Sequence, residues 1–329
     1  MRSSTILSRR TLLRALLLAA ALLPSTGFSQ AWPSRPITLI VPYTPGTGPD
    51  ILARAIGQRL GERLGQNVVV DNKPGASGNI GADLVAKAPP NGYTLMLTVN
   101  TFVITPALFR SLPYDPIADF TTIGKVAEGN VALVVNPQVL PVKTLDELVA
   151  YVRARPGKIN YGSPGNGTPQ HLAVELLKQR LGLDLVHVPY KGAAGANADL
   201  LAGQIQLMVL PVHTAQPFAK AGRLNVIAVS GENRSVIAPD SPSFAELGLK
   251  NLAIDLYFWM AGPAGLPREI VTRLNQEVNA IMASAEIREG MLKQGLVASI
   301  GAPEEIAAVI KADIERWKKF IADTKIRAD

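Results

Sequence analysis

Two segments of the chain share one order of features, and this pattern constrains the fold more than any other. Ile37–Leu64 and Ile159–Leu181 each contain a short apolar stretch, a loop rich in Gly, Pro and Thr, and an amphipathic stretch. We interpret each as a strand, a turn and a helix. Such a turn directs backbone N–H groups and the positive end of a helix dipole at one point, which suits a carboxylate or a phosphate. Two such points in two halves of the chain predict a ligand held between two lobes.

The N-terminus has the features of a secretory signal. Four arginines precede the apolar run Ala15–Leu23, and the small residues of Ser29–Ala31 predict cleavage after Ala31. The run is shorter than the ~20 apolar residues that span a bilayer, so we expect no membrane-embedded segment. Ser8–Leu13 resembles a twin-arginine export signal, which leaves two export routes open.

Composition narrows the functional classes. The formal charge is +7, and removal of the leader with its four arginines leaves +3 for the exported chain. The sequence shows no stripe of basic residues. Nucleic-acid binding is therefore not expected. The absence of cysteine excludes disulfides, thiolate metal sites and a lipid-modified cysteine. We predict a soluble, monomeric periplasmic protein that is large enough for two lobes without covalent cross-links.

Strands and helices are predicted to alternate, which indicates α/β lobes with largely parallel sheets. The strands are expected at Ile37–Val41, Val68–Asp71, Thr94–Val99, Val131–Val135, Leu185–Val188, Gln206–Leu210, Asn225–Val229 and Ala253–Met260. The helices are expected at Ile51–Leu64, Ile80–Lys87, Leu145–Ala154, Pro169–Leu181, Ala194–Ala202, Arg268–Ala283, Glu286–Gln294 and Glu304–Ile321. Thr144 with Glu147 forms a capping-box sequence at one helix start.

The chain is expected to cross between lobes twice, near Glu128–Asn130 and within Ala253–Met260, and two crossings make a hinge. Lobe 1 would contain residues 32–130 and about 254–300. Lobe 2 would contain residues 131–253 and about 301–329. Ligands of α/β sheets bind at the carboxyl ends of strands, which is where both Gly-rich loops lie.

The candidate ligand-binding residues follow the predicted strands. The first loop supplies Tyr43, Thr44, Gly46, Thr47 and Gly48, the second supplies Ser163, Gly165, Asn166, Gly167 and Thr168, and another strand end supplies Thr98, Asn100 and Thr101. His213 follows a strand and is placed either at the cleft or in a surface loop. Asp50 is interpreted as a structural cap at a helix start, and Thr168 as the cap of the helix opening with Pro169.

Two parts of the sequence resemble motifs of enzymes. Gly46-x-Gly48 followed by Asp71 at a later strand end imitates a dinucleotide fingerprint, but Ile51 replaces the third glycine and Pro49 lacks an N–H. A twin-arginine-exported nicotinamide-dependent oxidoreductase therefore stays as the alternative function. Tyr161 breaks the G-x-S-x-G spacing around Ser163, and the three histidines lie far apart in sequence. We expect no nucleophilic catalysis, no metal site and no cofactor.

Several segments together resemble the substrate-binding receptors of tripartite tricarboxylate transporters, often called the Bug receptors. The matching segments are Trp32–Ile37, Val70–Ala76, Gly78–Gly81, Asn91–Leu95, Leu112–Pro116, Asn160–Ser163 and His187–Gly192, and they span the exported chain. The resemblance implies a two-lobed periplasmic binding protein of the type II-like fold, not an enzyme. It also implies that both Gly-rich loops hold a carboxylate, with the turn Thr98–Thr101 reading the rest of the ligand, and that the protein delivers this ligand to transporter membrane subunits.

Three departures from the family pattern bear on the ligand. Thr47 replaces a glycine of the first loop, and Leu210–His213 stands where the family often has an Asp-Asn pair. Phe102, Val103 and Ile104 make the turn after Asn100 more apolar. These changes disfavour an amino-acid ammonium and favour an aromatic or alkyl carboxylate, or a ligand with a second polar group for His213. A pure interaction protein that responds to no small ligand is a third class.

Overall fold

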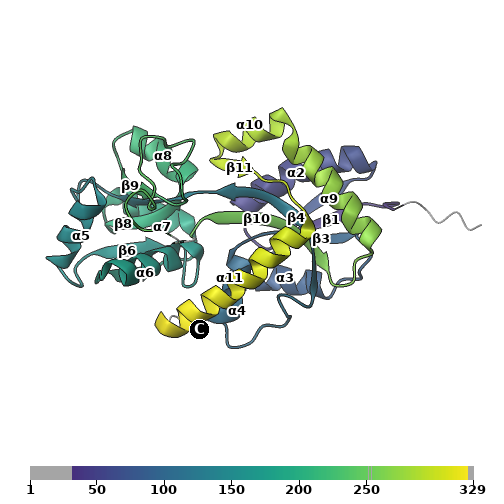
Figure 1. Cartoon of the computed structure of the whole chain (residues 1–329), viewed down its shortest axis with the longest axis horizontal. Helices are drawn as coiled ribbons and strands as arrows, with labels where there is room; N and C mark the ends of the chain where they lie inside the picture. The colour runs from purple at the N-terminus through teal and green to yellow at the C-terminus, as the bar shows by residue number, and fades with distance from the viewer. Residues whose placement is uncertain (1–31, 251, 253, 325–329) are drawn as a thin grey trace, which may run out of the picture.

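A computed structural model describes residues 32–250, 252 and 254–324, which form two α/β lobes arranged along the long axis of the molecule (Figure 1). The predicted signal segment, residues 1–31, lies outside the described residues. So does Ala253, the first residue of a predicted crossing strand. The two-lobed α/β architecture predicted from the sequence is confirmed.

The first lobe is built on a six-stranded sheet with the order β11-β4-β10-β3-β1-β2. Its strands are β1 (Ile37–Val41), β2 (Val68–Asn72), β3 (Thr94–Val99), β4 (Phe120–Gly129), β10 (Leu256–Pro263) and β11 (Leu296–Ala298). Its helices are α2 (Gly48–Leu64), η1 (Ala76–Gly78), α3 (Asn79–Ala86), α4 (Thr101–Leu108), α9 (Arg268–Ala283) and α10 (Ala285–Lys293). The apolar run of β1 is almost wholly buried because helices cover both sheet faces.

The second lobe is built on a five-stranded sheet with the order β7-β6-β8-β5-β9. Its strands are β5 (Val131–Val135), β6 (Asn160–Ser163), β7 (Val186–Pro189), β8 (Leu207–Pro211) and β9 (Asn225–Val229). Its helices are α5 (Leu145–Arg153), α6 (Pro169–Leu181), α7 (Ala193–Ala202) and α8 (Val212–Lys220). The predicted capping box is present at α5, where Glu147 N donates to Thr144 Oγ1 at 3.2 Å.

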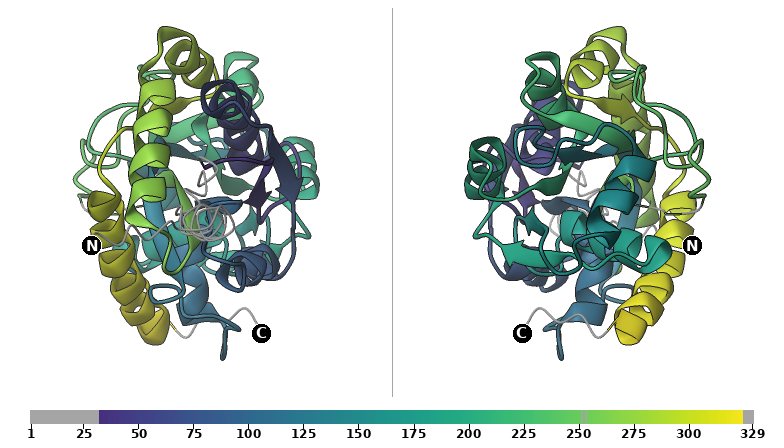
Figure 2. Two further views of the ribbon diagram at one scale, coloured as in Figure 1. Left: turned by 90° about the vertical axis from the view of Figure 1, so that its right-hand side faces the viewer. Right: turned by 90° about the vertical axis from the view of Figure 1, so that its left-hand side faces the viewer.

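The C-terminal helix α11 (Pro303–Thr324) packs against α4 and β4 of the first lobe. Figure 2, which looks along the long axis, places it along one flank of the molecule. The sequence interpretation placed this segment in the second lobe. Its apolar face instead enters the cluster that contains Phe102 and Trp259, and the residues of that face are Ile306, Ile310, Ile314, Trp317 and Ile321.

Three polar side chains meet where the chain crosses between the lobes. Asn130 links β4 to β5, and its Nδ2 donates to Ser230 O at 3.0 Å and to Asp255 Oδ1 at 3.1 Å. The Ser230 hydroxyl donates to the same Asp255 oxygen. Burial raises the pKa of Asp255, and the hydrogen bonds from Ser230 and Asn130 offset part of this rise. We call Asn130, Ser230 and Asp255 the hinge cluster.

Strand register places the candidate loops at the junction between the lobes. In the first lobe, β1 is parallel to β3, and Asn100, just after β3, donates from Nδ2 to Asp255 O at 2.9 Å. In the second lobe, Pro211 at the end of β8 pairs with Val131 at the crossing, and β6 is parallel to β8. The loops that follow β1, β3, β6 and β8 therefore all leave their sheets toward the hinge.

Both sheets are mixed rather than largely parallel. β10 runs antiparallel to β3 and β4, and β5 runs antiparallel to β8 and β9, because these strands carry the chain from one lobe to the other. The sequence interpretation missed β4, α4, α8 and β11. The β4 sequence mixes polar and apolar residues and so lacks a clear strand pattern. Pro106 in α4 and Pro217 in α8 are residues that disfavour a helix interior, so neither segment is predicted as a helix.

Candidate functional site

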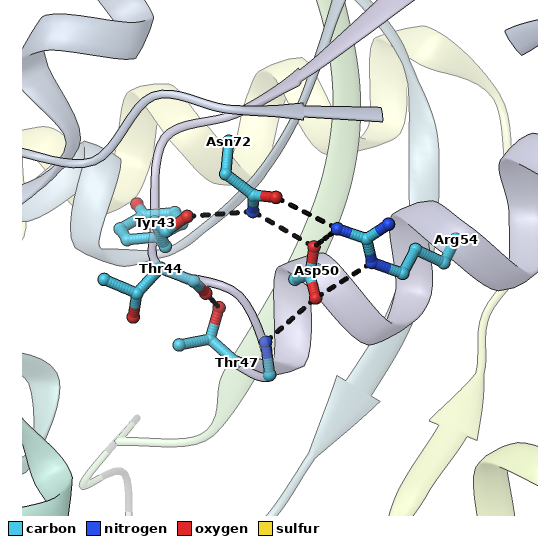
Figure 3. A network of polar contacts seen from close by, with 7 residues as sticks. Tyr43, Thr44, Thr47, Asp50, Arg54 and Asn72 are labelled. Carbon is cyan, nitrogen blue, oxygen red and sulfur yellow. Dashed lines mark hydrogen bonds and ion pairs between the residues drawn. The ribbon is translucent and has the colours of Figure 1, made fainter. Parts of the chain in front are cut away.

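The first loop, residues 42–47, is held in shape by side chains of α2 and β2 (Figure 3). Asp50, in the first turn of α2, accepts hydrogen bonds from Gly46 N at 2.9 Å and from Asn72 Nδ2 at 3.0 Å. It also forms an ion pair with Arg54 at 2.9 Å, and Asn72 donates to Tyr43 O at 3.0 Å. Asp50 is therefore a structural group, and it fastens the loop to the helix and to the neighbouring strand.

The charge of Asp50 is maintained despite its burial. Burial by itself raises the pKa of this carboxyl, but hydrogen bonds from Arg54, Gly46 and Asn72 outweigh it and hold the pKa below its usual range. The N-cap position of α2 is occupied by Thr47, not by Asp50. The Thr47 hydroxyl donates back to Thr44 O at 2.8 Å.

These contacts reduce the number of first-loop N–H groups that can meet a ligand. The Gly46 N–H is bonded to Asp50, and Pro49 has none. Gly48 N–H lacks a protein acceptor among the described residues. A Cβ at Gly48 would lie 3.1 Å from the ring of Phe258, so this backbone passes close to β10. The sequence interpretation did not connect Phe258 with this loop.

Tyr43 joins the first loop to the turn after β3. Its Oη lies 3.2 Å from Thr98 Oγ1. Burial raises the pKa of Tyr43 to about 12, with partial offset by the bonds to Thr98 and Thr101. Thr98, Asn100 and Thr101 are all buried, and Asn100 is tied to the hinge by its bond to the Asp255 carbonyl. Tyr43 thus connects the first loop to the turn after β3, and Asn100 connects that turn to the hinge.

The second loop, residues 163–168, also satisfies most of its own polar groups. Gly165 N donates to Ser163 Oγ at 3.2 Å, and Gly167 N donates to His171 Nδ1 at 3.0 Å. Thr168 Oγ1 donates to Gly165 O at 2.9 Å and accepts from His171 N at 3.4 Å, which confirms it as the cap of α6. Of the N–H groups of Gly165, Asn166 and Gly167, only that of Asn166 lacks a protein acceptor among the described residues.

Two histidines that are distant in sequence meet beside this loop. The rings of His171 and His187 are stacked, and His187 Nε2 lies 2.7 Å from Ser163 Oγ. Burial lowers the pKa of His171 to about 3, with further lowering by His187 and Lys178. Burial also lowers the pKa of His187 to about 4. Both rings are therefore neutral at ordinary pH.

Among the described residues, the two lobes also touch away from the hinge. The second loop meets α4 so closely that a Cβ at Gly167 would overlap the Leu108 side chain. The turn between α10 and β11 meets the start of α8, where a Cβ at Gly295 would lie 3.0 Å from His213 Cβ and 2.5 Å from Ile237 Cδ1. His213 is thus at the junction, and burial lowers its pKa.

The apolar residues expected to touch the ligand after Asn100 have another role. Phe102, Val103 and Ile104 are buried in α4, at 4%, 0% and 0% exposure. Phe102 packs edge-on against Trp259, with ring centroids 5.8 Å apart. These side chains belong to the core of the first lobe, and Leu108, which the sequence interpretation missed, is the α4 residue that reaches the second loop.

Within the described ranges, no group of three or more His, Asp or Glu side chains is placed to hold a metal ion. None of the helices described in the structure combines the length and apolar character needed to cross a bilayer.

Comparisons with known proteins agree with this architecture. The family model described as tripartite tricarboxylate transporter family receptor (TctC) matches residues 52–326. BugT of Bordetella pertussis is 33% identical over 298 residues, covering 90% of this chain and 91% of BugT.

Two solved structures share the fold along nearly their whole length. One, described as a periplasmic transporter, is 35% identical with a TM-score of 0.83, covering 91% of this chain and 100% of the other. Another, R. palustris Rpa4515 with adipate, is 36% identical with a TM-score of 0.82, covering 90% of this chain and 99% of the other.

Proposed function

The chain belongs to the tripartite tricarboxylate transporter receptor family, whose members are solute-binding receptors and not enzymes, and we propose that it captures a small carboxylate between its lobes and delivers it to a membrane transporter. The observation that carries this proposal is the convergence of the loops after β1, β3, β6 and β8 on one junction. The adipate held by a relative that is 36% identical supports a carboxylate as the ligand.

The proposed binding groups come from both lobes. Gly48 N–H and Asn166 N–H, each near the start of a helix, would face the anion, and the dipoles of α2 and α6 would stabilise its charge. The remaining candidates, which hold or surround these groups, are Tyr43, Thr44, Gly46, Thr47, Thr98, Asn100, Thr101, Ser163, Gly165, Gly167, Thr168 and His213. A buried carboxylate needs such donors because an unpaired buried charge is costly.

Lobe closure is the proposed mechanism. The lobes divide at the hinge cluster, between residues 130 and 131 and again near residue 255, and the ligand favours the closed arrangement by contacting both lobes at once. The Gly167–Leu108 contact supports this reading because it brings the second loop against the first lobe. The closed form of a monomer is what the transporter subunits would recognise.

The proposed ligand is a carboxylate without an ammonium group. The β8–α8 segment Leu210–His213 offers no carboxylate to pair with an ammonium. Leu108 and Phe258 are buried against the two loops, so they give the proposed anion-binding groups apolar surroundings, which suit an alkyl or aromatic body. Export to the periplasm through the cleavable N-terminal signal, by either route, completes the proposal.

Thermal unfolding of the purified protein with a ligand panel tests this function. The panel contains adipate, benzoate, succinate, aspartate and NAD. A ligand at ~100 times its Kd adds about 2.7 kcal/mol of stability, which raises Tm by roughly 2–4 °C per kcal/mol. We expect adipate or benzoate to raise Tm most. A stronger response to succinate or aspartate would contradict the ligand class, a response to NAD alone would favour the oxidoreductase, and no response would favour an interaction protein.

A further inference from the structure

We propose that His171 is a positioning residue of this carboxylate site, and that its neutral imidazole, stacked on His187, fixes the second loop by accepting the Gly167 N–H. The role in ligand binding rests on the proposed function, whereas the hydrogen bonds do not. His171 touches the loop from inside the lobe and is not itself offered as a ligand contact.

The bond from Gly167 determines the protonation state of His171. Gly167 N lies 3.0 Å from Nδ1, and an imidazole nitrogen that accepts a hydrogen bond carries no proton. The single ring proton is therefore on Nε2. His171 is only 5% exposed, so water cannot readily replace this acceptor. A protonated ring would turn the acceptor into a donor and break the bond to Gly167.

His187 extends the same support to the other end of the loop. Its Nε2 lies 2.7 Å from Ser163 Oγ, and that hydroxyl accepts the Gly165 N–H at 3.2 Å. The His187 ring thus supports Gly165 through the Ser163 hydroxyl, and the His171 ring supports Gly167 directly. The arrangement leaves Asn166 as the middle residue, with its N–H directed by the two fixed neighbours.

The charged groups around the pair act in opposite senses. Glu175 of α6 accepts from Lys178 Nζ at 2.6 Å and from the Tyr161 hydroxyl of β6. Burial and Lys178 lower the pKa of His187 and outweigh the charge of Glu175, which raises that pKa. For His171, burial, His187 and Lys178 all lower the pKa. The Tyr161 ring lies beside the pair, with its centroid 4.7 Å from that of His187 and 6.2 Å from that of His171.

Gly167 is the point at which this support affects the lobes. Its φ is +73°, and a Cβ there would overlap Leu108 of α4. The backbone that His171 holds is thus the same backbone that meets the first lobe. Losing the acceptor would loosen the loop at the contact on which closure depends.

Three variants separate positioning from simple packing. In His171→Asn, the amide oxygen Oδ1 is separated from Cα by the same number of bonds as Nδ1 of the histidine. The variant can therefore still accept from Gly167 N–H, but its side chain does not titrate. His171→Leu removes the acceptor, and Gln179→Asn, on the exposed face of α6, is the matched control. With adipate as the probe at pH 7.5, calorimetry should give about tenfold weaker binding for the Leu variant. The adipate affinity of the Asn variant should stay within about threefold of that of the unmodified protein, and the affinity of the control should equal that of the unmodified protein.

Ring spectra without ligand supply an independent test. Nitrogen-15 correlation spectra between pH 4 and 8 should give His171 an unprotonated Nδ1 throughout, and the Gly167 amide proton should shift upfield in the Leu variant only. Titration of His171 near its ordinary value of about 6.5 would overturn the proposal. Equal affinity of the Leu and Asn variants would also overturn it. If the unmodified protein does not bind adipate, the proposed ligand fails, and the ring spectra and the Gly167 amide still decide the role of His171.

Discussion

The imidazoles of His171 and His187 lie face to face, with centroids 3.9 Å apart and ring planes inclined by 11°. The two residues come from α6 and β7, sixteen positions apart, and both serve the loop that precedes α6. A pair of neutral bases buried this closely makes the stability of the second lobe depend on pH.

Acid should destabilise the protein through this pair. Unfolded histidines take up a proton near pH 6.5, whereas in the folded state the pKa values are about 3 and about 4. Between these limits the unfolded chain binds more protons, so the stabilisation is complete above pH 6.5 and is lost as pH falls. At pH 5 the loss is roughly 2 kcal/mol for each ring. Urea unfolding at pH 5 and pH 7.5 measures it.

The variant His171→Asn isolates this effect. It should lose roughly half of the pH dependence, because one of the two rings no longer titrates. The raised pKa of Asp255 acts in the opposite sense, since folding then favours proton uptake, but that contribution is the same in both proteins. Identical pH profiles for the unmodified protein and the variant would contradict the prediction.

Adding a methyl group at Gly167 should prevent full closure. Gly167→Ala places a side chain against Leu108 and at a positive φ, which costs about 1–2 kcal/mol of stability. The overlap should also weaken adipate binding by at least about tenfold. Gly222→Ala is the control, because Gly222 has a φ of +68° but open space around it. It should lose similar stability and keep its affinity; equal affinity losses would argue against the lobe contact.

Removing the hydroxyl of Thr168 should affect both folding and binding. Thr168→Val deletes the cap of α6 and the bond to Gly165 O, which should lower stability by ~1 kcal/mol. Binding should weaken by a further ~1–3 kcal/mol as the loop loosens. Thr144→Val removes the corresponding cap of α5, away from the junction, and should lower stability only. Calorimetry that finds unchanged affinity for Thr168→Val would remove Thr168 from the site.

The carboxylate of Asp50 should stabilise the first loop. Asp50→Ala leaves Gly46 N–H and Asn72 without their acceptor, so unfolding free energy should fall by about 1.5–3 kcal/mol. Adipate affinity should fall as well, because Gly46 no longer fixes the turn before Gly48. Asp146→Ala, an exposed acid in the first turn of α5, should change neither quantity. A stable Asp50→Ala protein with full affinity would mean that the loop needs no anchor.

The parts of the fold that sequence predicted correctly are those with purely local causes. Val131–Val135 is apolar at every position and lies buried on both faces, and Thr144 with Glu147 forms the expected capping box. By contrast, β4 is a strand because β10 and β11 pair with both of its edges, which no local pattern records. The α4 helix begins with residues that favour strands and holds Pro106, so only its packing against α11 explains it.

The candidate site shows the same division. Sequence placed both loops at strand ends, and their positions at the junction follow from strand register. It could not tell which N–H groups were already bonded, since Gly46 and Gly167 each find an acceptor four residues later, inside the following helix. The meeting of His171 with His187 and the contact of Gly167 with Leu108 depend on tertiary packing, so residue spacing contained no signal for them.

The hinge cluster has a practical consequence for engineering. The five-stranded lobe begins after Asn130 and ends near Asp255, and the side chains of these two residues are joined by a hydrogen bond of 3.1 Å. The chain therefore enters and leaves this lobe through almost the same point. We expect that residues 131–254 can be exchanged as a block with those of a relative, giving chimaeras whose recognition of solute combines half of each parent while Asn130 and Asp255 stay in place at the two junctions.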